Sequence, residues 1–205
     1  MIELFVVLAV LTFFALMIIP ANSRPKGGGL RIRCVNNLKQ IGLATRVWEG
    51  DHGDKFPFSV SKTNGGAMEF AFGPNLWKNF QVMSNELSTP KVLICPTDTR
   101  DAATNFDFLS NSNISFFIGI DAGEFNPQLI LGGDRNITNG TLVKNGILEV
   151  TTNTPVGWTA EQHNHVGNLL LSDGSVQQLS QAGLRTSVQN TGLFTNRLLM
   201  PILGP

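Results

Sequence analysis

The first twenty residues constrain this chain most, because they form an almost unbroken apolar run. From Leu4 to Ile19 there are sixteen residues, and Thr12 is the only polar one among them. No polar face appears at the 3.6-residue helical period, so a helix here is apolar on all sides. A helix of about 20 residues is roughly 30 Å long, close to the hydrocarbon thickness of a bilayer. The sequence therefore predicts a transmembrane helix over residues 1–20 that carries the rest of the chain.

A cleaved signal peptide is the alternative for this segment. Such a peptide has basic residues before its apolar run and small residues at the cleavage site. No Lys or Arg precedes Leu4, and the segment from Ile18 to Ser23 fits the cleavage pattern poorly. A retained membrane helix is therefore the favoured interpretation.

The remaining composition is typical of one turn-rich domain. Basic and acidic residues balance at 15 each, so no overall charge attracts the chain to nucleic acid. Charged residues make up only 15% of the sequence, while Gly, Asn, Ser and Thr are abundant, which favours turns and strands over long solvated helices. Residues 30–205 are long enough to bury a core of their own.

Proline and glycine separate the apolar run from the next helix. Pro20, Pro25 and Gly27–Gly29 predict a hinge over residues 21–29. Apolar spacings of three and four then predict an amphipathic helix that ends at Gly50 and Gly53. Its buried stripe consists of Leu30, Cys34, Leu38, Ile41, Thr45 and Trp48. A second stripe, formed by Leu76, Phe80, Met83 and Leu87, predicts a helix that stops before Pro90.

The C-terminal half has the pattern of strands. Short apolar and β-branched runs predict strands within residues 91–95, 114–120 and 128–131. Asn145-Gly146 and Asp173-Gly174 each lie between two such runs and predict hairpins over residues 142–150 and 168–179. The predicted fold class is therefore α+β, with an N-terminal transmembrane helix and an amphipathic helix packed on an antiparallel sheet.

Several motifs together resemble the type IV pilins and the type II secretion pseudopilins. Met1-Ile2-Glu3-Leu4 and its apolar run are similar to the N-terminus left in that family when a peptidase removes a basic leader ending in Gly. The segments 34–42, 51–57 and 95–98 resemble one bacterial branch of the family. That branch ends in a signature of His, nine residues and Asp-Gly, which is matched here by His163, Asp173 and Gly174, with Asn168 as its internal Asn.

The resemblance implies a pilin-like fold and a structural, non-enzymatic role in a type II secretion or type IV pilus-like envelope filament. Its implied partners are other pilin-like subunits through the N-terminal helix, the membrane and the secretion machinery. Glu3 would pair with the N-terminal amine of a neighbouring subunit.

The resemblance also implies a single-pass inner-membrane protein with its domain on the periplasmic side. The basic residues from Arg24 onward indicate the opposite orientation by the positive-inside rule, and a basic leader before the helix would reverse that preference. The family normally runs one continuous helix where this chain has Pro25 and Gly27–Gly29.

A second interpretation is a membrane-anchored extracytoplasmic binding protein that holds a glycan or surface polymer and does not polymerise. Trp48, Trp77 and Trp158 are its candidate contact residues, although tryptophans in such positions are more typical of a core.

His163 and Asp173 are candidates for chemistry, and His52 or His165 could join them at a metal. No Glu or Cys is spaced to complete such a set, and no His-Glu-x-x-His motif occurs. We therefore expect structural roles, with His163 hydrogen-bonded beside the hairpin and Asp173-Gly174 forming its turn.

Two acidic loops are weak candidates for calcium, since Ca²⁺ prefers oxygen ligands. They contain Asp51 with Asp54 and Asp98 with Asp101, a spacing that is also common in solvated turns. The primary expectation is therefore no cofactor.

Cys34 and Cys95 are too few for a disulfide scaffold and lack zinc-motif spacing. Export would place them in an oxidising compartment, where a bridge would close a loop of about 60 residues. Two buried free thiols are the alternative.

Overall fold

The computed structural model describes residues 2–18 and 27–203 of the chain. It divides into two compact units, Met1–Leu30 and Arg31–Pro205, which we describe separately. The first unit contains α1 (Ile2–Ile18), whose side chains are mainly aliphatic and aromatic. The second unit, which we call the head, holds the remaining core and all of the sheet.

Helix α1 corrects the prediction of a transmembrane segment over residues 1–20. Its described part, Ile2–Ile18, has 17 residues. Within residues 2–18 and 27–203, no helix combines the length and the apolar character needed to cross a bilayer. The predicted membrane anchor is therefore wrong, as is the single-pass inner-membrane localisation that depended on it.

The predicted hinge over residues 21–29 is only partly covered by the structure. Residues 21–26 lie outside the described part of the chain. The three glycines that follow do not interrupt the helix, because α2 (Gly27–Gly50) begins at the first of them. Each glycine disfavours a helix by roughly 1 kcal/mol, but packing of the later turns stabilises α2 as a whole.

Helix α2 packs its predicted apolar stripe into the head. Cys34, Leu38, Ile41, Thr45 and Trp48 are at most 5% exposed. The basic side chains of Arg33, Lys39 and Arg46 lie on exposed positions. Ser172 and Ile94 anchor the helix through their carbonyls, which accept hydrogen bonds from Arg46 and Asn37.

The head is an α+β domain built on one six-stranded antiparallel sheet. Its strand order is β4-β8-β1-β2-β6-β7. The strands are β1 (Phe116–Gly119), β2 (Ile130–Asp134), β4 (Ile147–Thr151), β6 (Gly167–Leu171), β7 (Val176–Leu179) and β8 (Thr195–Leu199). A second sheet pairs β3 (Ile137–Thr138) with β5 (Gly157–Trp158).

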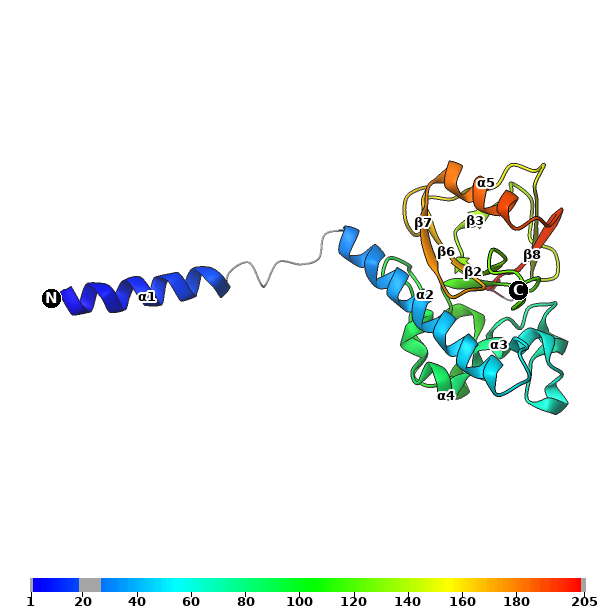
Figure 1. Cartoon of the computed structure of the whole chain (residues 1–205), viewed down its shortest axis with the longest axis horizontal. Helices are drawn as coiled ribbons and strands as arrows, with labels where there is room; N and C mark the ends of the chain where they lie inside the picture. The colour runs from blue at the N-terminus through cyan, green and yellow to red at the C-terminus, as the bar shows by residue number, and fades with distance from the viewer. Residues whose placement is uncertain (1, 19–26, 204–205) are drawn as a thin grey trace. The chain divides into compact units, whose positions relative to one another are not determined.

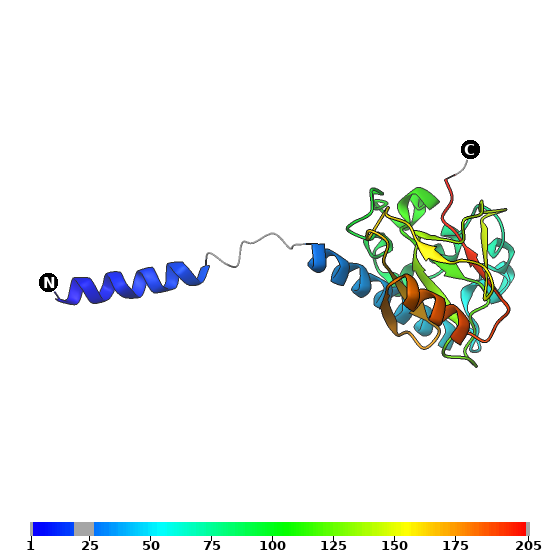
Figure 2. The same cartoon turned by 90° about the horizontal axis from the view of Figure 1, so that it is seen from above.

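Both faces of the large sheet are buried. Alternate residues along a strand enter different core clusters, as with Phe116 and Ile118 on one side and Phe117 on the other. The first cluster includes the buried face of α2, and the second includes Leu184 and Val188 of α5 (Gln181–Asn190). The sheet is thus the middle layer between α2 and α5 (Figures 1 and 2).

Residues 74–95 depart from the predicted helix and strand. The predicted helix is divided into α3 (Trp77–Gln81) and α4 (Ser84–Leu87), although its stripe is buried as predicted. The predicted strand over 91–95 is wrong, because Pro90–Leu93 form a 3₁₀ helix. Pro90 suits a first helical turn, and the Thr89 hydroxyl caps it by accepting from the Lys91 amide. Further 3₁₀ turns are Pro57–Ser59, Lys62–Asn64, Met68–Phe70, Phe106–Phe108 and Asn111–Asn113.

The two predicted hairpins have different outcomes. The hairpin over residues 168–179 is confirmed by the antiparallel pairing of β6 with β7. At Asn145-Gly146 the turn forms with positive φ at both residues, but only the isolated bridge between Lys144 and Ile147 precedes β4. Strand β4 pairs with β8 instead, so the segment before the turn is not a sheet strand.

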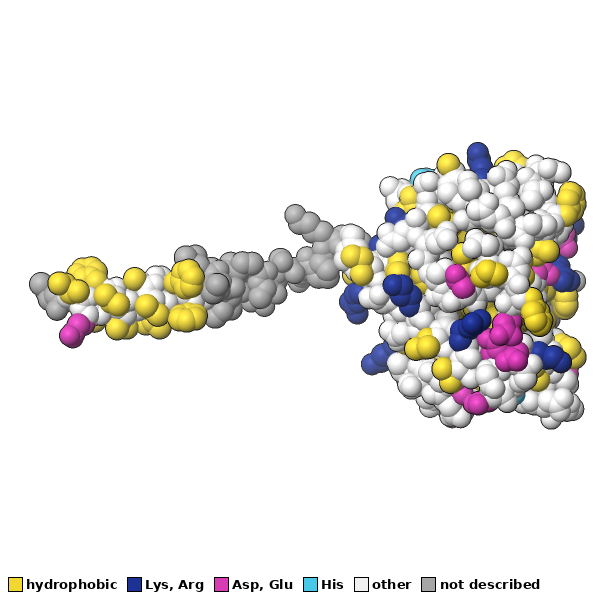
Figure 3. All heavy atoms as spheres, in the orientation of Figure 1, with side chains coloured by type: hydrophobic (Ala, Val, Ile, Leu, Met, Phe, Trp, Pro, Cys, Tyr) yellow, Lys and Arg dark blue, Asp and Glu magenta, His cyan; other side chains and the backbone are white. Residues whose placement is uncertain are grey.

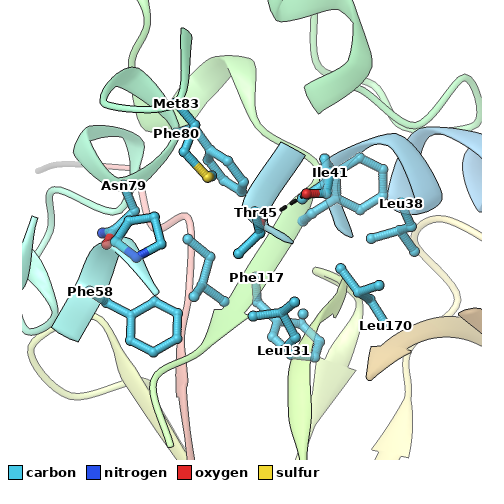
Figure 4. A pocket seen from close by; sticks show the side chains of 14 residues that line it. Leu38, Ile41, Thr45, Phe58, Asn79, Phe80, Met83, Phe117, Leu131 and Leu170 are labelled. Carbon is cyan, nitrogen blue, oxygen red and sulfur yellow. Dashed lines mark hydrogen bonds between the residues drawn. The ribbon is translucent and has the colours of Figure 1, made fainter. Parts of the chain in front are cut away.

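The core between α2, α3 and the sheet contains one small cavity (Figure 4). Its volume is about 20 Å³, which is space for about one water molecule. Leu38, Phe80, Met83 and Leu170 contribute to its largely apolar lining. This space is therefore an imperfection in packing and too small to be a ligand pocket.

Candidate functional site

The polar residues of greatest interest meet between α2 and one end of strands β2 and β6. Cys34 comes from α2, Cys95 follows the 3₁₀ helix Pro90–Leu93, Asp134 is the last residue of β2, and His163 lies in the loop before β6. One ligand atom from each of these four residues lies within 4.8 Å of the others. We call them the cysteine–histidine cluster.

A disulfide joins the two cysteines of this cluster. The Cys34–Cys95 bridge links α2 to the segment after the 3₁₀ helix across a sequence separation of 61. Both residues are fully buried. The sequence left a bridge and two free thiols open, and the structure contains the bridge. Disulfides are typical of oxidising compartments.

Asp134 is the least expected member of the cluster, because it is an acidic side chain with no exposed surface. Its Oδ2 accepts hydrogen bonds from the Asn168 amide at 2.7 Å and from Asn168 Nδ2 at 2.9 Å. Its Oδ1 lies 3.3 Å from Cys34 Sγ. Asn168, the internal Asn of the signature, thus holds this carboxyl group with both its main chain and its side chain.

His163 directs its imidazole into the cluster, and its side chain is only 3% exposed. Nε2 lies 3.3 Å from Asp134 Oδ2 and 3.4 Å from Cys95 Sγ. Nδ1 lies 3.3 Å from Thr97 Oγ1. Thr97 belongs to the turn after Cys95-Pro96, where the Asp98 amide donates to the Cys95 carbonyl at 2.9 Å.

Burial moves the pKa values of the two ionisable members in opposite directions. Removal from water raises the pKa of Asp134 to about 7, although the hydrogen bonds from Asn168 oppose the shift. Removal from water, assisted by the nearby Arg31 guanidinium, lowers the pKa of His163 to about 4. Near neutral pH the imidazole is therefore uncharged and the carboxyl group is partly protonated.

Arg31 provides the positive charge next to the cluster. Its Nε donates to Asn168 Oδ1 at 3.3 Å and its Nη2 donates to the Gly167 carbonyl at 3.0 Å. Neither Arg31 nor Asp134 was predicted from the sequence to belong to a site. Arg31 lies off the apolar stripe of α2. Asp134 follows Gly132-Gly133, and this glycine-rich pattern resembles a phosphate-binding loop only superficially.

The signature of His, nine residues and Asp-Gly is divided between two places. His163 belongs to the cluster, whereas Asp173 and Gly174 form the turn between β6 and β7. Asp173 Oδ1 accepts from the Ser175 amide at 2.8 Å, and Gly174 has a φ of +83°. Asp173 is exposed and stabilises the turn through this hydrogen bond.

The weak calcium candidates do not form one site. Asp51, Asp54 and Asp101 are exposed. The Asp98 carboxylate accepts two hydrogen bonds from Arg135, each at 2.8 Å, and one from Gln162 at 3.1 Å. Burial alone would raise the pKa of Asp98, but the Arg135 hydrogen bonds and charge hold it below its ordinary value. Asp98 therefore acts as the partner of Arg135.

The other two histidines lie elsewhere. His52 stacks on Trp48 with ring centroids 3.6 Å apart, and His165 Nδ1 lies 3.2 Å from the Trp158 carbonyl oxygen. Trp48 and Trp158 are each 2% exposed, so these two indole rings belong to the core and are not available to a glycan. Trp77, the third tryptophan considered from the sequence, is partly buried.

Glu3 lies in the first turn of α1, and Thr12 is the only other polar residue between Ile2 and Ile18. Ile2, Leu4 and Phe5, its neighbours, are 81%, 67% and 72% exposed.

Comparisons with known proteins add no relative to these observations. No protein-family model, no curated protein and no solved structure matches this chain.

Proposed function

We propose that this chain is a structural subunit of a pilin-like filament, of the kind found in type II secretion and type IV pilus systems, and that copies associate through α1. The observation that carries the proposal is an apolar helix whose side chains are exposed from Ile2 to Phe14 (Figure 3). Burying one such Leu, Val or Phe side chain fully stabilises an assembly by about 1.5–3 kcal/mol. Between Ile2 and Phe14, ten large apolar side chains are exposed, so burying them favours association.

The motifs that resemble the pilin and pseudopilin family support the same proposal. They place an acidic residue, Glu3, at the start of the apolar helix. An uncompensated carboxylate among packed apolar helices is costly, so a positively charged group of a neighbouring subunit is its natural partner.

The head supports a structural role and not a catalytic one. The His163 imidazole is 3% exposed and Asp134 is fully buried, so neither reaches a substrate in this conformation. Calcium is not part of the proposal, because Asp98 is occupied by Arg135.

Assembly of the full chain tests the proposal. The purified protein is expected to form filaments that sediment on ultracentrifugation and are visible by negative-stain electron microscopy. Leu8→Lys places a charge on α1, where Leu8 is 51% exposed, and should abolish sedimentation. Phe125→Lys is the matched control on the head, since Phe125 is 97% exposed. Sedimentation that is equally strong in Leu8→Lys would disprove assembly through α1.

A further inference from the structure

The cysteine–histidine cluster has the donor set of a zinc site. We propose that reduction of the Cys34–Cys95 disulfide converts the cluster into a tetrahedral Zn²⁺ site with Cys34, Cys95, Asp134 and His163 as ligands. The inference does not depend on filament assembly. It rests on the position of four donor atoms and on the groups that hold them.

Two distances that meet at the His163 imidazole match the edges of a zinc tetrahedron. With Zn–S bonds of about 2.3 Å and Zn–N or Zn–O bonds of about 2.0–2.1 Å, the edges of the tetrahedron are roughly 3.3–3.8 Å. His163 Nε2 lies 3.4 Å from Cys95 Sγ and 3.3 Å from Asp134 Oδ2, so these two distances match. The other carboxylate oxygen, Asp134 Oδ1, lies 3.3 Å from Cys34 Sγ. One ligand atom from each of the four residues lies within 4.8 Å of the others. Zinc binding therefore requires separation of the two sulfurs once their bond is broken, together with small shifts of the other donors.

Neighbouring groups orient the ligands as they do in zinc proteins. The second nitrogen of a zinc-bound histidine usually bonds to an oxygen, and ligating carboxylates are themselves hydrogen-bonded. Here His163 Nδ1 lies 3.3 Å from Thr97 Oγ1, and Asn168 donates twice to Asp134 Oδ2. Two thiolates and a carboxylate around Zn²⁺ carry one net negative charge, which Arg31, bonded to Asn168 and Gly167, offsets.

The chemical step is an exchange between a disulfide and a dithiol reductant. Two electrons from the dithiol break the Cys34–Cys95 bond, two protons pass to the sulfurs, and the dithiol becomes a disulfide. Binding of Zn²⁺ then releases the two thiol protons to solvent, together with any proton on Asp134. The disulfide form has no thiolate to offer, so oxidation closes the site. Cys34, Cys95 and Asp134 are fully buried, so the reductant and the metal require a local opening of the surrounding segments. The loop before β6 borders the cluster at His163, and its residues Glu161, Asn164 and His165 are exposed.

Zinc binding by the full chain is the direct test. One sample keeps the disulfide, and the other is reduced anaerobically with a phosphine that is then removed. Both receive ZnCl₂ and pass through gel filtration before metal analysis. The reduced chain should retain one zinc per molecule and the disulfide form none. Equal retention in both forms, or none in the reduced form, overturns the proposal.

Ligand variants show whether these four residues hold the metal. His163→Gln and Asp134→Asn should each weaken zinc binding by the reduced chain at least tenfold, and Co²⁺ should lose the absorption of a tetrahedral thiolate site. His165→Gln is the matched control and should bind zinc as the unmodified chain does. Equal loss in His163→Gln and His165→Gln overturns the assignment.

Folding of the reduced chain is followed by near-ultraviolet circular dichroism. If reduction removes the native spectrum, Zn²⁺ should restore it in the unmodified chain and not in Cys34→Ala/Cys95→Ala. A reduced chain that stays unfolded after zinc addition would contradict the proposal. A reduced chain that is folded and binds no zinc would contradict it equally.

Discussion

At the scale of single residues, Asp134 and His163 form a buried pair whose proton affinities are shifted towards the uncharged forms. The pKa of Asp134 rises from 3.8 to about 7, so folding stability from this group is full below pH 3.8 and is lost as the pH rises towards 7. The pKa of His163 falls from 6.5 to about 4, so its contribution is present above pH 6.5 and is lost as the pH falls towards 4. Between about pH 4 and pH 6.5, the stability contributed by Asp134 falls as the pH rises and that contributed by His163 increases, so the two effects oppose each other.

In the unmodified, disulfide-bonded protein, the pH dependences that Asp134 and His163 give to the unfolding free energy largely cancel. Substitution of one residue at a time should therefore reveal each pH dependence separately. Relative to the unmodified chain, the unfolding free energy of His163→Gln should fall with rising pH between about 4 and 6.5. That of Asp134→Asn should rise between about 4 and 7. Each slope is limited to about 1.4 kcal/mol per pH unit, the value for one proton. Urea unfolding at several pH values measures this, and pH-independent differences would contradict the neutral pair.

Gly174 determines the turn between β6 and β7 through its backbone alone. A Cβ at this position would meet no atom within 4 Å, and φ is +83°. Gly174→Val should lower the unfolding free energy by about 1–2 kcal/mol, because a β-branched residue disfavours positive φ. Gly174→Asn is the matched control and should lose much less, since Asn tolerates this region. Equal losses in thermal or urea unfolding would place the cause outside the backbone conformation.

At the scale of elements, Glu3 is the acidic residue in the first turn of the largely apolar helix α1, and it carries the proposed contact between subunits. Glu3→Ala should leave folding of the head intact while its incorporation into filaments falls, because the proposed intersubunit ion pair is lost. Glu3→Asp should be intermediate, since its side chain is shorter. Co-sedimentation of tagged variant subunits with unmodified chains measures incorporation.

Thr12→Ala provides the control for Glu3 on the same helix. The Thr12 hydroxyl bonds to the Leu8 and Ala9 carbonyls at 3.0 and 2.9 Å, so it is satisfied within α1. Incorporation of Thr12→Ala should match the unmodified chain. If Glu3→Ala enters filaments equally well, the role assigned to Glu3 is wrong.

At the scale of the whole molecule, the disulfide fastens α2 to a distant segment of the head. Its ends are separated by 61 positions, and the chain-entropy relation gives about 4 kcal/mol for a loop of this length. Cys34→Ala/Cys95→Ala should lose roughly that much unfolding free energy relative to the oxidised chain. Thiol labelling of the denatured, unreduced chain should detect no free cysteine, and two labels per chain would contradict the bridge.

The sequence by itself determined the elements whose information is local. The stripe from Cys34 to Trp48 specified α2, because a 3.6-residue period needs no distant partner. Asp173-Gly174 specified its hairpin, because the turn depends on residues within it. The apolar character of residues 4–18 was also plain, but the membrane assignment failed, because no helix within residues 2–18 and 27–203 combines the length and the apolar character that a crossing requires.

Only the tertiary structure decided the rest, because it depends on contacts between distant segments. Residues 91–95 have the composition of a strand, yet Pro90 and the Thr89 cap favour a 3₁₀ turn over Pro90–Leu93. Cys95, which follows this turn, is bonded to Cys34 of α2. Residues 181–190, which sequence analysis treated as strand-like, form α5 because Leu184 and Val188 cover the second face of the sheet. Nothing local marks Asp134, since its character comes from burial beside Asn168 and His163, which are far from it in sequence.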